Sequence, residues 1–238
     1  MMIPLSYTLR SLFIRRAATL LSIVGIGLTV AIFAGVLALQ QGFVTMFAGH
    51  GRTDVLICLR PGATGETDSQ FSRERGLKLM KSTPEFVQGP KGPMASMESY
   101  SGLLRPKLGG GEVNVAFRGV QPATFEIRGD EIKLVEGRLF EPGADEVIVG
   151  RRLVERVANC RVGDVMQINT TPFRVVGVFD HDGSFVSEIW CDLDRALEEY
   201  RTSVRIDPGH VAGHNRIGLL LARKGDLEGA SVAVDAAL

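Results

Sequence analysis

Residues 17–49 read AATLLSIVGIGLTVAIFAGVLALQQGFVTMFAG and contain no charged side chain. The most apolar part, Ala17 to Leu39, would be about 34 Å long as a helix. A helix of this length crosses a hydrocarbon core of roughly 30 Å with modest tilt. A core helix of a soluble protein would keep a polar face, which this stretch lacks. The stretch therefore predicts one transmembrane helix with a short extension to residue 49, and the lipid bilayer is the first expected partner.

The preceding segment, residues 1–16, reads MMIPLSYTLRSLFIRR. Its apolar side chains recur at helical spacing, which favours an amphipathic helix lying at the membrane interface. A plain basic flank fits the same residues equally well. In either case the positive charges of Arg10, Arg15 and Arg16 precede the apolar run, and the positive-inside rule then places the N-terminus in the cytoplasm.

A cleaved signal peptide is the competing interpretation of this N-terminal region. Its apolar core would span about 7–15 residues before a small-residue cleavage site. The apolar run here is longer, and no convincing cleavage site interrupts it. We therefore expect an uncleaved, single-pass anchor in the inner membrane of a bacterium, with the rest of the chain in the periplasm.

Three small residues of the apolar stretch, Gly27, Ala31 and Gly35, are spaced by four and share one helix face. Small residues in this pattern let a second helix approach closely. Gly and Ala are also simply common in membrane helices, so the pattern has an alternative explanation. The spacing is a hypothesis for a helix-packing face.

The composition of the 238-residue chain excludes several classes of function. Lys and Arg total 27, as do Asp and Glu, and this zero net charge gives no electrostatic reason to expect nucleic acid as a partner. Three widely spaced cysteines, Cys58, Cys160 and Cys191, form neither a disulfide framework nor a zinc pattern. We expect them to be buried single thiols, and we expect no metal and no cofactor.

Residues 53–193 alternate between short strand and helix patterns. Val113, Val115 and Phe117 alternate with Asn114, Ala116 and Arg118, which is typical of a strand with one buried face. Further strands are predicted at residues 55–59, 146–150, 165–169 and 173–179, and helices at residues 71–80 and 151–157. The fold class that this order predicts is α+β, with a mixed core domain behind the transmembrane helix.

Five pieces of the chain together resemble one known family. They are IPLSYTLRSLFIRR before the apolar stretch, GRLFEPGADEVIVGRRL at 137–153, VGDVMQI at 162–168, FRVVGVFDHDGS at 173–184 and SEIWCDL at 187–193. Their order and spacing resemble permeases of the MacB/FtsX type, which belong to ABC transporters, and residues 53–193 resemble the periplasmic core domain of that family.

The resemblance implies a dimeric permease subunit that works with a second copy, with a separate or fused ABC ATPase and with a periplasmic protein partner. The chain has no GxxxxGK[ST] phosphate loop, so it is not expected to be the ATPase itself. A complete permease of this type carries three further spans. No uncharged apolar run after residue 49 approaches the length of a membrane span. We therefore expect a truncated permease.

The composition changes at residues 194–238, and this tail resembles part of a tetratricopeptide repeat, whose period is 34 residues. The residues that match this pattern are Ala196, Tyr200, Pro208, Ile217, Gly218, Leu221 and Ala230. The predicted helices span residues 192–206, 211–224 and 227–237. An ordinary helical hairpin is the alternative.

Two groups of polar residues contain side chains of the kind found in metal or acid–base sites. Asp180, His181 and Asp182 follow a predicted strand, and a polar turn explains them better than a metal or acid–base site. His210 and His214 lie four apart, but no third metal ligand is evident nearby. No catalytic, cofactor-binding or metal-binding residue is therefore assigned, and no enzyme activity is expected.

Two functions from different classes fit these observations. The first is a permease subunit of an ABC transporter, supported by the family resemblance. The second is a membrane-anchored protein-interaction module that uses the core domain and the tail helices without transport activity. Association with an ABC ATPase discriminates between them.

Overall fold

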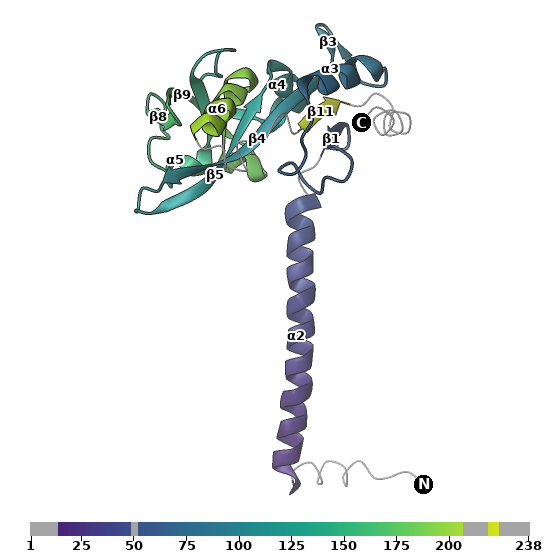
Figure 1. The fold of residues 1–238 in the computed structure, drawn as a ribbon. Coiled ribbons are helices and arrows are strands. Elements are labelled where there is room, and N and C mark those ends of the chain that lie inside the picture. The colour runs from purple at the N-terminus through teal and green to yellow at the C-terminus, as the bar shows by residue number, and fades with distance from the viewer. Residues whose placement is uncertain (1–13, 49–51, 207–218, 224–238) are drawn as a thin grey trace. The chain divides into compact units, whose positions relative to one another are not determined.

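The computed structural model describes residues 14–48, 52–206 and 219–223. The chain divides into two units, Met1–Gly51 and Arg52–Leu238. The first is represented by one helix and the second by a mixed sheet with helices on its faces (Figure 1).

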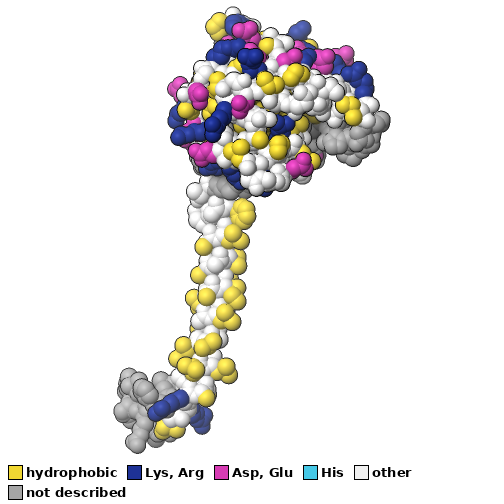
Figure 2. Space-filling model, turned by 90° about the vertical axis from the view of Figure 1, so that its left-hand side faces the viewer, with side chains coloured by type: hydrophobic (Ala, Val, Ile, Leu, Met, Phe, Trp, Pro, Cys, Tyr) yellow, Lys and Arg dark blue, Asp and Glu magenta, His cyan; other side chains and the backbone are white. Residues whose placement is uncertain are grey.

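The first unit is the single helix α2, Arg16–Ala48. Its large apolar side chains are exposed along its length, and Figure 2 shows hydrophobic side chains along the face of the helix in view. The hydroxyls of Ser22, Thr29 and Thr45 donate to the carbonyl oxygens four residues earlier at 2.9–3.0 Å, so these polar groups are satisfied within the helix. In the described part of the chain, α2 is the one helix long and apolar enough to cross a membrane. The predicted helix is confirmed.

The second unit contains a sheet of nine strands in the described residues, in the order β1-β11-β4-β5-β10-β7-β9-β6, with β8 paired to β9. Its strands are β1 (Val55–Cys58), β4 (Ala95–Pro106), β5 (Glu112–Val120), β6 (Lys133–Gly137), β7 (Glu146–Gly150), β8 (Val165–Ile168), β9 (Thr171–Asp180), β10 (Glu188–Asp192) and β11 (Leu219–Arg223). The β10–β5 and β7–β9 pairs are parallel and the others antiparallel. A separate hairpin joins β2 (Gln88–Gly89) to β3 (Gly92–Pro93).

The helices of this unit are short. They are α3 (Arg73–Ser82), α4 (Pro122–Arg128), α5 (Arg151–Val154), α6 (Leu193–Ile206) and the 3-10 turns η1 (Gly129–Glu131) and η2 (Ser184–Ser187). The Ser72 hydroxyl caps α3 by accepting from the Arg75 amide, and Pro122 begins α4, where a proline costs no hydrogen bond. The predicted α+β fold class is confirmed.

Strand β4 joins the two halves of the sheet. Its first residues, 95–98, pair with β11, and residues 99–106 pair with β5. Gly110 and Gly111 have positive φ angles in the turn to β5, a backbone conformation that other residues rarely adopt. The twelve-residue strand before this turn was not predicted, because its Ser, Gly and Met residues give no strong strand signal.

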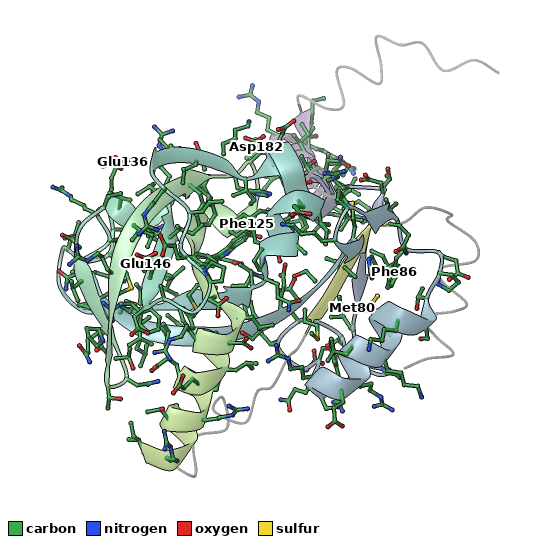
Figure 3. All side chains as sticks on the ribbon, turned by 90° about the horizontal axis from the view of Figure 1, so that it is seen from above. Met80, Phe86, Phe125, Glu136, Glu146 and Asp182 are labelled. Carbon is green, nitrogen blue, oxygen red and sulfur yellow. The ribbon has the colours of Figure 1, made fainter. Side chains whose placement is uncertain are left out.

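Three apolar clusters form the interior. The first cluster joins β1, α3 and the start of β4 and includes Phe71, Leu79, Phe86 and Met97. The second cluster lies on the face of the sheet that α6 covers. The third cluster surrounds Trp190 on the opposite face. Figure 3 shows Phe86 of the first cluster and Met80, an α3 residue packed against it, apart from Phe125, which packs against the third. Large hydrophobic side chains on both sheet faces are thus removed from water.

Helix α6 packs directly on the sheet. The Asp192 carboxylate caps its start by accepting from the Asp194 and Arg195 amides. Ala196 and Tyr200 are buried in the domain, and a Cβ on Gly119 of β5 would lie 2.4 Å from the Ala196 Cβ, so the close approach requires a glycine. The apolar face of the first predicted tail helix therefore docks on the core domain.

The helix predicted over residues 211–224 is wrong where the structure describes it. Leu219–Arg223 forms strand β11, which pairs antiparallel with both β1 and β4, so Leu221 lies in the sheet. The local pattern suggested a repeat helix, but the edges of β1 and β4 offer main-chain hydrogen bonds that favour a strand. Pro208, Ile217, Gly218 and Ala230 lie outside the described residues.

All three cysteines are buried, as predicted. Burial raises the pKa of the Cys160 thiol to about 11 and that of Cys191 well above its usual range. Because thiolates are the reactive species, we expect none of the three to react with iodoacetamide at pH 8 while the domain is folded. Mass spectrometry should detect three adducts only after labelling in denaturant; fast labelling of Cys160 or Cys191 in the native protein would contradict this burial.

Candidate functional site: a buried arginine network

Arg118 lies in the middle of β5, and its side chain is 1% exposed. The strand alternation predicted a solvent-facing position, because Asn114 and Ala116 share this face. The face is open at Asn114, but further along it is covered by the aromatic cluster around Trp190. The prediction for Arg118 is therefore wrong, since a second core covers the end of the strand.

Three carboxylates surround the Arg118 guanidinium. Glu188 accepts from Nε at 2.8 Å and from Nη2 at 3.1 Å, Glu98 accepts from Nη1 at 3.0 Å, and Glu66 accepts from Nη2 at 2.7 Å. Burial disfavours the charged guanidinium, but the carboxylates outweigh this cost and hold the pKa of Arg118 well above its usual value. The network thereby joins four segments that are distant in sequence.

Aromatic rings complete this environment. The rings of Tyr100 and Phe185 both lie 5.0 Å from the Arg118 guanidinium carbon, within the range of cation–π attraction. The Trp190 indole N–H donates to Glu188 at 2.8 Å. The charges are thus held in one geometry by both polar and apolar neighbours.

A second arginine, Arg128 at the end of α4, extends the network towards the start of the domain. Its guanidinium lies 3.8 Å from Glu98 and 4.3 Å from the centre of the Phe185 ring. Arg52 donates to the backbone carbonyls of Ile127 and Arg128 at 3.2 Å, where the negative end of the helix dipole favours a cation. Asp54 pairs with Arg52 at 2.5–2.8 Å, and the hydrogen bond to Asp54 raises the pKa of Arg52.

Arg52 is the first residue of the second unit, and three residues separate it in sequence from the end of α2. Consecutive contacts therefore lead from the residue where the domain begins, through Arg128 and Glu98, to Arg118 at the centre of the sheet. This arrangement can fix the start of the domain to its core.

The structure places the other predicted residues as follows. Arg15 and Arg16 are exposed at the start of the helical region, and Arg10 lies outside the described residues. Gly27, Ala31 and Gly35 are exposed on α2, and a Cβ on either glycine would meet no described atom within 4 Å. Both glycine positions therefore leave room for a neighbouring helix, but the described residues include no such helix to test this.

The Asp180, His181 and Asp182 sequence forms a polar turn after β9. Arg151 donates to Asp180 at 3.1 Å, and the Gly183 amide donates to the His181 Nδ1 at 2.6 Å. Burial lowers the pKa of His181, and the turn borders a polar hollow of about 430 Å³. The described residues include no group of three side chains arranged to hold a metal ion. His210 and His214 lie outside them.

Little in the sequence predicts the arginine network. Glu188 and Trp190 are two apart in a strand and so share a face, which is a detectable local signal. Nothing local connects them with Glu66, Glu98 or Arg118, because those contacts span 20 to 70 residues of chain. The network depends on the order of strands β4, β5 and β10.

An apolar anchoring helix followed by a mixed sheet domain defines a class of membrane-anchored proteins with an extramembrane domain. The family model for the MacB-like periplasmic core domain matches residues 19–236. The chain belongs to this family. No curated protein matches the sequence.

Two solved structures share the fold. The periplasmic region of MacB from Actinobacillus actinomycetemcomitans is 18% identical, with a TM-score of 0.50, and the match covers 78% of this chain and 81% of that one. The extracellular domain of the noncanonic ABC-type transporter YknZ from Gram-positive bacteria is 12% identical, also with a TM-score of 0.50, covering 75% and 88%.

Replacing Arg118 by Met should destabilise the domain by about 3–5 kcal/mol, because Glu98 and Glu188 would stay buried without a counter-charge. Glu66→Gln should cost only about 0–1 kcal/mol, since its side chain is 27% exposed. Urea unfolding followed by the fluorescence of Trp190, the single tryptophan, measures both. Arg152→Met, at an exposed arginine, is the control and should change little. Equal effects of the Arg118 and Arg152 substitutions would show that the network contributes nothing.

Proposed function

We propose that this protein is a permease-type subunit of an ABC transporter, anchored by α2, whose extracytoplasmic domain acts through protein contacts and not through catalysis. The observation that carries this proposal is the family match over residues 19–236, which includes both the apolar helix and the sheet domain. The two structural relatives, a periplasmic region of MacB and an extracellular domain of an ABC-type transporter, support the same fold.

The arginine network suits a domain that receives movement from a membrane helix. Arg52 holds the first residues of the domain to the end of α4, and Arg128 and Glu98 continue to Arg118. A displacement of the chain at residue 52 would therefore move packed elements and not a loose linker. In this proposal the ATP-driven movement of a separate ATPase reaches the sheet through these contacts.

The proposed orientation places the N-terminus in the cytoplasm and the domain outside it. Arg15 and Arg16 lie at the N-terminal end of the apolar helix, Arg10 precedes them in sequence, and no basic residue occupies the last turn of α2. Protease added to intact bacterial spheroplasts should therefore digest the domain, detected with an antibody against it. A cytoplasmic marker protein should survive as the control. Protection of the domain until the membrane is permeabilised would refute the orientation.

The proposed partners are an ABC ATPase, a second permease copy and an extracytoplasmic protein. A second copy or another membrane helix would pack on the face formed by Gly27, Ala31 and Gly35, where the described structure leaves open space beside both glycines. A membrane-anchored interaction module without an ATPase is the competing function. Such a module would bind extracytoplasmic proteins but would not bind an ATPase.

Substituting both Gly27 and Gly35 by Leu should abolish helix association, because bulky side chains keep the backbones apart. Differently tagged copies and the ATPase should co-purify from membranes with the wild-type chain and be reduced at least several-fold with the double variant. Gly25→Leu, on a different helix face, is the matched control and should co-purify normally. Wild-type protein that retains an extracytoplasmic partner but never an ATPase would favour the competing function.

A further inference from the structure

A cavity of about 320 Å³ lies between the second half of α6, strand β4 and the end of β8. This volume falls at the lower end of the range for small-molecule pockets. It forms where β4 lacks a second neighbour: residues 99–106 pair with β5, whereas β11 reaches only residues 95–98. The side chains of β8 and α6 therefore border the unpaired edge of β4 in the described structure.

Arg105 of β4 lines this cavity and is 8% exposed. Its Nη1 donates to the Gln167 carbonyl at 2.7 Å, but its Nε is buried without a hydrogen-bond partner in the described residues. None of the ion pairs of these residues includes Arg105, and the nearby Cys160 thiol is neutral because burial raises its pKa to about 11. A buried guanidinium N–H without a hydrogen-bond partner is costly, which makes an acceptor group in this cavity favourable.

Tyr200 of α6 supplies a second donor to the same cavity. Its side chain is also 8% exposed, and its hydroxyl makes no hydrogen bond of ordinary geometry with the described residues, although Ser101 lies close. Burial raises the pKa of Tyr200, so the hydroxyl stays protonated and can donate. Two buried donors thus lack acceptors within one cavity.

The acceptors in the cavity wall are already occupied. The Glu199 carboxylate accepts from Thr171 Oγ1 at 2.6 Å through Oε1 and from Asn169 Nδ2 at 3.1 Å through Oε2. A cationic ligand would therefore have to displace these bonds, whereas an acceptor group meets free donors. Arg105 and Tyr200 thus offer free donors, which favour a ligand with an acceptor group such as a carboxylate.

The rest of the lining is apolar. Phe117 and Ile168 are buried at the inner side, and Leu104 and Ile206 are large hydrophobic residues left 69% and 62% exposed at the cavity. A ligand with a hydrocarbon body would cover this surface and remove it from water.

We infer that this cavity binds a small amphipathic carboxylate, with its carboxylate on Arg105 and Tyr200 and its hydrocarbon body against Leu104 and Ile206. The site is distinct from the arginine network, which lies on the opposite face of the sheet. It does not depend on the permease assignment.

The test uses the full chain in phosphatidylcholine nanodiscs, with empty nanodiscs as the blank for partitioning into lipid. Calorimetric titration and saturation-transfer NMR compare hexanoate with hexanamide and hexylammonium, which keep the hydrocarbon body and change the head group. Hexanoate should bind at least tenfold more tightly than hexanamide, because the charge-assisted hydrogen bonds are lost with the amide. Hexylammonium should not bind measurably.

Arg105→Met should remove the preference for hexanoate, and thermal melting checks that the variant is folded. Tyr200→Phe should weaken hexanoate binding several-fold with little change in volume. Arg201→Met, at the exposed neighbour on α6, is the matched control and should bind as the wild type does. Equal binding of hexanoate and hexanamide, unchanged binding by the Arg105 variant, or absence of binding by all three probes would overturn the inference.

Discussion

The structure of the extramembrane domain depends on the placement of one cation, Arg118, among three carboxylates inside the sheet. Removing a guanidinium from water is expensive unless hydrogen-bonded opposite charges replace the water. Here Glu98 and Glu188 come from the two strands that flank β5, and Glu66 comes from the loop before α3. The strand order β4-β5-β10 is therefore the arrangement in which these charges compensate one another.

The same network fixes the first residue of the domain to the interior of that domain. The chain enters the domain at Arg52, whose hydrogen bonds to the end of α4 lead on to Arg128 and Glu98. Helix α2 differs from the domain in how its polar groups are satisfied and in which side chains it exposes. Its hydroxyl groups donate hydrogen bonds within the helix, and its apolar side chains face outward. One unit is suited to lipid and the other to water, and each has its own means of satisfying polar groups.

The sequence predicted elements well where a local period is strong. Residues 146–150 and 173–179 are β-branched runs and form β7 and most of β9, and the alternation from Val113 to Phe117 marks β5 correctly. The sequence did not predict strand β4, which is long but poor in β-branched residues. It also predicted a helix where the structure has strand β11. Both misses lie where pairing with distant strands decides the conformation, and such context routinely overrides local propensity.

The sequence by itself determined that the chain has one long charge-free helix, that a domain of the MacB-like periplasmic core family accompanies it, and that its cysteines are isolated. These properties follow from composition and from the spacing of neighbouring residues. Only the tertiary structure decided that Arg118 is buried and paired, that Arg105 is buried and unpaired, and that β11 completes the sheet. The physical reason is that burial and charge compensation depend on which distant strands become neighbours, and local periodicity carries no information about that choice.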